Sequence, residues 1–180
     1  MPSATRPSPY EKFSVYVFDT ALPAPSITEK CVVLRPSKSA GLPARISAEG
    51  VARSPIGWQL DPKAFRDVLV DVHERYRLPV YVTENGAGAE EKPDATGVVN
   101  DSERIEYLKS YTAALREAVG RGADVRGYFV WSLLDNFEWG AGYASRFGLV
   151  YVDYPSQRRI PKASAHWYAR LIHQHALRSA

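Results

Sequence analysis

The fold is decided by two stretches, Pro79-Val80-Tyr81-Val82-Thr83-Glu84-Asn85-Gly86 and Gly127-Tyr128-Phe129-Val130-Trp131-Ser132-Leu133-Leu134-Asp135-Asn136-Phe137-Glu138-Trp139. Each begins with apolar, β-branched and aromatic residues and ends in carboxylate, amide and indole groups. This pattern is typical of a buried parallel strand that delivers polar side chains to its C-terminal end. In α/β barrels the functional groups gather at that end. Glu84 is therefore the candidate reactive carboxylate, and the 131–139 segment is the candidate binding wall beside it.

Helical patterns precede and separate the two strands. Asp61 has the character of an N-cap, with Pro62 at the first helical position, where its missing N–H costs nothing. Asp101 or Ser102 is expected to cap the second helix, and Gly120 and Gly122 are expected to end it. The predicted buried stripes are Phe65, Val68, Leu69, Val72 and Tyr76 in the first helix, and Ile105, Leu108, Thr112, Leu115 and Val119 in the second.

The loop after Gly86 is about fifteen residues long, which favours a functional rim. Within it, the charged run 90–92 (Glu-Glu-Lys) is expected to be solvated. Residues 147–152 are predicted to be extended, and Pro161 is predicted to open a last helix. The residues expected to face inward on that helix are Trp167, Leu171 and Ile172. The order helix, strand, helix, strand, helix indicates an α/β fold with parallel strands.

The chain divides into a loop-rich segment, residues 1–53, and a better patterned part, residues 54–180. In the first segment, residues 13–18 and 31–34 have the composition of strands. A closed (β/α)8 barrel takes about 200 residues or more, whereas these 180 residues offer two clear strands and two further candidates. The expected fold class is α/β, as the C-terminal portion of a (β/α)8 barrel that is incomplete.

Composition and charge exclude several classes of protein. The chain is 45% hydrophobic and 24% charged, and its net charge of +3 is dispersed, so no nucleic-acid surface is expected. The single Cys31 excludes an internal disulfide, and no His or Cys residues have zinc spacing. No stretch approaches the roughly 20 apolar residues of a membrane helix, and the N-terminus lacks the apolar core of a secretory signal. We expect a soluble, cytoplasmic protein without membrane contact.

The two strand stretches, taken together, resemble the C-terminal third of family 1 glycoside hydrolases, the β-glucosidase and β-galactosidase group. The residues that carry the resemblance are Thr83-Glu84-Asn85-Gly86 and the block from Trp131 to Trp139. Further matching pieces are residues 54–58, 146–153 and 159–164, in family order and with family spacing. The combination is far more specific than Thr-Glu-Asn-Gly alone. It implies a (β/α)8 barrel in which Glu84 ends the seventh strand and Trp131 ends the eighth.

The resemblance also implies a role for each candidate residue. Glu84 would be the nucleophile of a retaining β-glycosidase, attacking the anomeric carbon to form a covalent glycosyl-enzyme. Trp131 would present its indole face to the sugar ring, and Glu138 would accept hydrogen bonds from O4 and O6. Trp139 would donate its N–H to O3, and Phe147 would line the same pocket. The implied substrate is a terminal β-D-glycoside or an oligosaccharide, with no cofactor and no metal.

Each role has a plainer structural alternative. Glu84 could be a surface carboxylate in a loop, and Trp131 and Trp139 could be ordinary core aromatics. Asp135 and Asn136 could either cap a turn or support the site from behind. The motif context favours the functional interpretation for Glu84 and for the two tryptophans.

Important parts of the family pattern have no counterpart in this sequence. The family's acid/base lies in an Asn-Glu-Pro motif that ends strand four, and no Asn-Glu-Pro occurs here. Residues 14–17 are at most a degraded relative of the Asn-Tyr-Tyr of strand six. Two hypotheses remain: a β-glucosidase-like enzyme whose acid/base half is supplied elsewhere, and a non-catalytic truncated remnant with at most weak sugar binding. The open strand edges predict either a complementary N-terminal half or self-association.

Overall fold

The computed structural model describes residues 13–17, 30–32, 52–54 and 60–179. From residue 60 to residue 130 helices and strands alternate as the sequence predicts, and a two-stranded hairpin then precedes the last helix. The elements are β1 (Phe13–Val17), β2 (Lys30–Val32), α1 (Pro62–Tyr76), β3 (Val80–Asn85), α2 (Ser102–Gly120), β4 (Val125–Val130), the 3-10 turn η1 (Trp139–Ala141), β5 (Val150–Val152), β6 (Arg159–Pro161) and α3 (Ala163–Ser179).

The main sheet has four strands in the order β2-β1-β3-β4. The prediction that the two strands carrying Glu84 and Trp131 are parallel neighbours is confirmed, because β3 pairs with β4 in parallel. The two strands expected near the N-terminus exist, but β1 runs antiparallel to β3, with Ser14 opposite Glu84. An antiparallel neighbour does not belong to an all-parallel barrel. The four strands described form an open sheet rather than a closed barrel.

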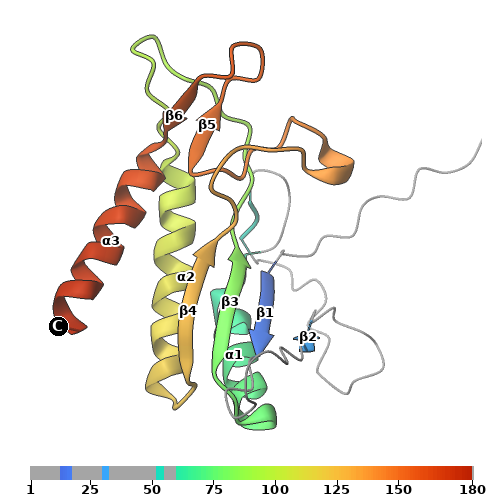
Figure 1. Cartoon of the computed structure of the whole chain (residues 1–180), viewed down its shortest axis with the longest axis vertical. Helices are drawn as coiled ribbons and strands as arrows, with labels where there is room; N and C mark the ends of the chain where they lie inside the picture. The colour runs from blue at the N-terminus through green and yellow to red at the C-terminus, as the bar shows by residue number, and fades with distance from the viewer. Residues whose placement is uncertain (1–12, 18–29, 33–51, 55–59, 180) are drawn as a thin grey trace, which may run out of the picture.

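The helices gather on one face of this sheet (Figure 1). The side chains of Val80 and Val82 point from β3 into a core built with α1 and α2, and both are fully buried. α3 packs beside α2, and its Trp167 and Tyr168 lie partly buried against the same core. On β4 the side chain of Phe129 is 57% exposed, so this side chain lies outside the core that the helices share with the sheet.

The first helix forms as its sequence predicts. The Asp61 carboxylate accepts a hydrogen bond from the Ala64 N–H at 2.9 Å, which satisfies one of the free donors of the first turn. Arg77 ends the helix in the left-handed conformation with φ 54°, and its N–H donates to the His73 carbonyl at 2.8 Å. The inclusion of Tyr76 in the buried stripe is wrong, since this residue is 37% exposed.

The second helix is correctly placed, but its predicted buried face is rotated. Val119, expected inside, is 45% exposed, whereas Leu108 is fully buried. The residues that α2 buries are Arg104, Tyr107, Leu108, Tyr111, Ala114 and Ala118. Tyrosine and alanine therefore fill the interface with α1, while the β-branched residues lie at its margin or outside it.

The last helix begins at Ala163, because Pro161 belongs to β6, which pairs antiparallel with β5. The expectation that Ile172 faces inward is wrong, since its side chain is 52% exposed. Within the part of the chain that the structure describes, no helix has the length and apolar content needed to cross a membrane.

Candidate active site

The candidate residues lie where β3 and β4 end. Both arrows point toward the β5–β6 hairpin in Figure 1, so both strands deliver their last residues to the same edge of the sheet. Glu84 is the penultimate residue of β3 and is half-buried. Trp131 follows β4 directly, and its backbone N–H donates to the Asn85 carbonyl at 3.0 Å. The backbone ladder thus places Trp131 beside the residue next to Glu84.

Two glycines allow the loop after β3 to touch the candidate wall. A Cβ on Gly86 would lie 1.7 Å from the Trp131 carbonyl oxygen, and one on Gly88 would lie 2.5 Å from the Phe147 ring. No side chain fits in either place, so glycine is required for this close approach. Ala89 and Arg146 then exchange two backbone hydrogen bonds, at 3.1 and 2.9 Å. The loop following Glu84 is therefore packed against both Trp131 and Phe147.

Backbone hydrogen bonds join the 131–139 segment to the segment that carries Phe147. The Ser132 N–H donates to the Phe147 carbonyl at 3.0 Å, and the Leu149 N–H donates to the Ser132 carbonyl at 2.8 Å. The peptide bond between Trp131 and Ser132 is cis. Phe147 is 1% exposed, so its ring is enclosed by these loops.

Glu138 and Trp139 are neighbours with opposite surroundings. Glu138 is only 5% exposed, and the Trp131 indole N–H donates to its carboxylate at 3.4 Å. Trp139 is 76% exposed and has φ 44°, a left-handed conformation that few bulky residues adopt. The structure therefore joins Trp131 to Glu138 directly, while the Trp139 ring extends toward solvent.

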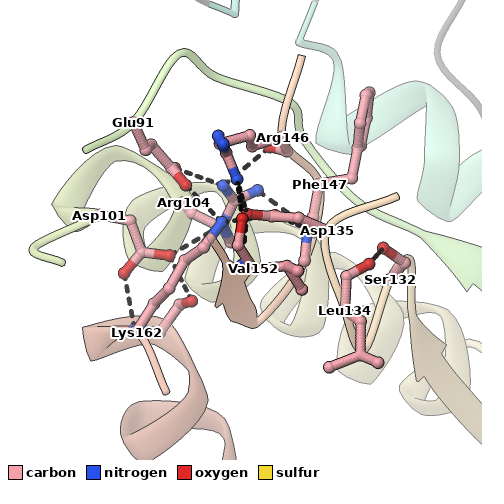
Figure 2. A network of polar contacts seen from close by, with 12 residues as sticks. Glu91, Asp101, Arg104, Ser132, Leu134, Asp135, Arg146, Phe147, Val152 and Lys162 are labelled. Atoms are coloured by element: carbon pink, nitrogen blue, oxygen red, sulfur yellow. Dashed lines mark hydrogen bonds and ion pairs between the residues drawn. The ribbon is translucent and has the colours of Figure 1, made fainter. Parts of the chain in front are cut away.

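A buried carboxylate that the sequence left ambiguous supports this wall. The Asp135 side chain is fully buried and accepts hydrogen bonds from four donors (Figure 2). The donors are the N–H groups of Gly148 (2.9 Å) and Val152 (3.3 Å), Arg146 Nη1 (2.7 Å) and Lys162 Nζ (2.9 Å). Asp135 therefore fixes the middle of the 131–139 segment to β5, to the loop before it and to the residue that precedes α3.

A second buried charge cluster lies behind the loop after β3. Arg104 is 3% exposed and pairs with Asp101, at 2.8 Å, and with Glu91. Glu91 also binds Lys162, and Asp101 accepts hydrogen bonds from the N–H and hydroxyl of Ser164. The expectation that Glu91 is solvated is wrong, because its side chain is only 8% exposed. The charges of buried Arg104 and Lys162 require these buried acids as partners.

Sequence reasoning missed this cluster, although one signal was present. Arg104 lies one helical turn before Tyr107 and Leu108, on the face that α2 buries. A charged residue on a buried helical face indicates a partner nearby. Asp101 lies three residues before Arg104, a spacing that the sequence shows. Glu91 and the carbonyls of residues 87, 146 and 147 lie on other segments, so spacing along the sequence could not identify them.

Two tyrosines, on α3 and β4, form a chain of hydrogen bonds that ends at the last residue of β3. Tyr168 donates to the Tyr128 carbonyl at 2.9 Å, and the Tyr128 hydroxyl donates to Asn85 Oδ1 at 2.6 Å. Burial raises the pKa of the Tyr128 phenol well above its usual value, with a smaller contribution from Tyr168. Asn85 is fully buried, and its Nδ2 has no hydrogen-bond partner among the described residues. The residue after Glu84 is thus held by a neutral donor from β4.

A surface hollow elsewhere on the chain is separate from these residues. It lies beside α1 and α2, where Leu60, Arg66 and Glu117 contribute to its lining, and none of the five candidate residues borders it. The strand-end arrangement of Glu84, Trp131, Glu138 and Phe147 is the better candidate site.

Residues 26–177 match the family described as Glycosyl hydrolase family 1. The bifunctional β-D-glucosidase/β-D-fucosidase of Bifidobacterium breve is 47% identical over 128 residues, which are 68% of this chain and 28% of that protein. β-Glucosidase A of Thermotoga maritima is 43% identical over 138 residues, covering 75% of this chain and 31% of the relative. A 6-phospho-β-galactosidase of Lacticaseibacillus rhamnosus is 40% identical, covering 74% and 31%.

The solved structures give the same relationship. The β-glucosidase from Thermotoga maritima in complex with castanospermine matches with a TM-score of 0.68 at 42% identity, covering 71% of this chain and 29% of that one. The chain thus spans about three tenths of the length of the relatives that it matches. From the family match and these identities, the chain belongs to glycosyl hydrolase family 1.

Proposed function

We propose that this chain carries the nucleophile half of a retaining β-glycosidase that acts on terminal β-D-glycosides, with β-glucosides as the first substrate class to test. The observation that carries the proposal is the contact between the two strand ends. Glu84 lies in the last two residues of β3 and Trp131 directly follows its parallel neighbour β4, and Gly86 lies against the Trp131 carbonyl. Relatives whose names include β-glucosidase share 43–47% identity with this chain. In this proposal β3, α2, β4 and α3 are the last two strand–helix units of a (β/α)8 barrel.

The proposed reaction has two displacement steps at one carbon. An oxygen of ionised Glu84 forms a bond to the anomeric carbon while the bond to the leaving-group oxygen breaks, and a second carboxylic acid gives that oxygen its proton. Water then attacks the same carbon, the second carboxylate takes the proton from the water, and Glu84 leaves as a carboxylate. In retaining enzymes the two carboxyl groups lie about 5–5.5 Å apart.

The 131–139 segment is proposed to hold the sugar during these steps. Glu138 is an acceptor for the outer hydroxyls, and its link to the Trp131 indole at 3.4 Å orients the two groups toward each other. In the proposal Trp139 donates its exposed indole N–H to O3 of the sugar, and Phe147 lines the same pocket. Such contacts raise the rate where they become stronger in the transition state than in the ground state.

The second carboxyl group is proposed to come from outside this sequence, which has no Asn-Glu-Pro motif. A complementary N-terminal half of the barrel would supply it and would pair with β4. The antiparallel strand β1 occupies the side of β3 where that half would also need to pair. This observation favours the second candidate function, a remnant that binds sugar weakly and does not turn over.

Turnover of an aryl glucoside separates the two candidates. The full chain is mixed with the part of Thermotoga maritima β-glucosidase A that precedes the matched region, and hydrolysis of 4-nitrophenyl β-D-glucopyranoside is followed. We expect turnover in the mixture, and a loss on the order of 10³-fold or more with Glu84→Gln, because the nucleophile is removed. Glu90→Gln, a change at an exposed residue of the following loop, is the matched control.

The outcomes have distinct meanings. Equal turnover by the wild type and Glu84→Gln would contradict the assignment of Glu84. A mixture that assembles, as shown by co-elution, but hydrolyses nothing would support the non-catalytic remnant instead.

A further inference from the structure

We propose that Arg104 is a positioning residue, which sets the spacing between the loop that follows Glu84 and the segment that carries Phe147. The inference rests on the proposed function for its consequence, since those two segments border the candidate site. The evidence for the inference is the geometry of the Arg104 guanidinium group. Arg104 itself does not contact the proposed substrate; it acts through backbone groups of both segments.

The Arg104 guanidinium donates to three backbone carbonyls, all of which belong to the two segments. Its Nη1 donates to Ala87 O and, at 3.5 Å, to Phe147 O, while its Nη2 donates to Arg146 O at 3.1 Å. Ala87 lies three residues after Glu84, and Phe147 packs its ring on Gly88. Figure 2 shows Arg104 beside Arg146 and Glu91, with the Phe147 ring directed away from the charge cluster.

Two carboxylates hold the guanidinium itself in place. The Asp101 carboxylate accepts a hydrogen bond from Arg104 Nε at 2.8 Å, and the Glu91 carboxylate accepts one from Nη2. Asp101 is held in turn by Ser164 at the start of α3, and Glu91 is held by Lys162. Arg104 therefore transmits the position of two helix ends, those of α2 and α3, to the site loops.

The chemistry of this residue demands arginine. A guanidinium offers five N–H donors in a planar fork, which matches acceptors that converge from several directions. A lysine in the same place keeps the charge but offers a single nitrogen, which cannot reach the carbonyls of Ala87, Arg146 and Phe147 together. If position 104 requires the planar guanidinium and a positive charge alone does not suffice, then Arg104 acts by positioning the two segments.

The test uses the full chain labelled with 5-fluorotryptophan and observed by ¹⁹F NMR. The sequence has four tryptophans, and Trp→Phe substitutions assign the resonances of Trp131 and of Trp167, which lies on α3. We expect Arg104→Lys to move the Trp131 resonance by more than its linewidth and to leave the Trp167 resonance in place. Arg66→Lys is the matched control, because Arg66 pairs with Asp67 and Glu117 away from the site.

Chemical rescue distinguishes positioning from a general loss of structure. In Arg104→Ala, guanidinium chloride at concentrations well below those that unfold proteins should return the Trp131 resonance toward its wild-type position. The same concentration of sodium chloride should not. An unchanged Trp131 resonance in Arg104→Lys would overturn the proposal, and so would a common shift or loss of all the tryptophan signals in that variant. Failure of the proposed enzymatic function would leave these spectra unaffected, so the two failures are distinguishable.

Discussion

Asp135 shows how a single residue can hold an entire segment. Its carboxylate accepts hydrogen bonds from two backbone N–H groups and from two cationic side chains, and each of its oxygens accepts two of them. Lys162, one of those cations, is fully buried. A buried ion pair contributes little net stability, yet removal of one partner leaves an uncompensated charge in a medium of low polarity.

Asp135→Asn is expected to lower the free energy of unfolding by about 3–5 kcal/mol, because the amide removes the carboxylate paired with Arg146 and leaves buried Lys162 with Glu91 alone. Urea unfolding followed by circular dichroism measures the change. Glu106→Gln, which breaks the exposed pair with Lys109, is the matched control and should cost about 1 kcal/mol or less. Equal losses in the two variants would contradict the account of Asp135.

Tyr128 should make stability depend on pH on the alkaline side. Its phenol is neutral in the fold and donates to Asn85, and burial raises its pKa above the usual 10.0. The folded state therefore holds this proton more tightly than the unfolded state. The contribution to stability is complete below pH 10.0 and is lost as the pH rises through the folded-state pKa.

Tyr128→Phe checks this sign. Below pH 10.0 the variant should be less stable than the wild type by about 1 kcal/mol, the usual value of one hydrogen bond. Above that pH the difference should shrink, as measured by urea unfolding over a pH series. A difference that stays constant or grows with rising pH would show that the assignment is wrong.

At the scale of elements, the sequence located the helices well and their buried faces less well. Caps and breakers are local, so Asp61 and Pro62 were sufficient to mark the start of α1, and Gly120 and Gly122 the end of α2. The buried face of α2 depends instead on what packs against it. Tyr111 stacks on Tyr107 and contacts Phe65 of α1, with ring centroids 4.1 and 5.3 Å apart. A stripe read from branched aliphatic residues alone therefore placed Val119 inside.

Two alanine substitutions on α2 test which face is buried. Leu108→Ala should cost about 2–5 kcal/mol of unfolding free energy, because Leu108 is fully buried in the shared core. Val119→Ala removes a side chain that is 45% exposed and should change stability by about 0.5 kcal/mol or less. Thermal and urea unfolding of both variants measure the two losses of stability. A larger loss for Val119→Ala than for Leu108→Ala would contradict the buried face of α2 described above.

The candidate site was predictable from the sequence to a similar, limited extent. Strand ends rich in polar groups identified Glu84 and Trp131, and the parallel pairing that brings them together is confirmed. The charge cluster behind them was not predictable, because Arg104 finds Glu91, Ala87 and Phe147 through the fold rather than through spacing. The proposed catalytic and binding roles of Glu84 and its neighbours remain predictions.

At the scale of the whole molecule, the helices pack on one face of the sheet, and β4 lies at the edge of the sheet formed by the described strands. Among the residues described, no strand pairs with the outer side of β4. Phe129 and Leu133, in and after that strand, are 57% and 68% exposed. A free strand edge beside exposed apolar side chains is suited to another chain, which supports the proposed complementary half or self-association.

Covalent labelling of Glu84 tests the central claim most directly. The full chain, alone and mixed with the N-terminal part of Thermotoga maritima β-glucosidase A, is treated with 2,4-dinitrophenyl 2-deoxy-2-fluoro-β-D-glucopyranoside. Dinitrophenolate leaves without protonation, so labelling needs the nucleophile and the sugar site but no acid. Mass analysis of the mixture should show one adduct, on the peptide that contains Glu84, lost in Glu84→Gln and kept in Glu90→Gln. No adduct in the mixture, or an adduct on another carboxylate such as Glu138, would contradict the account.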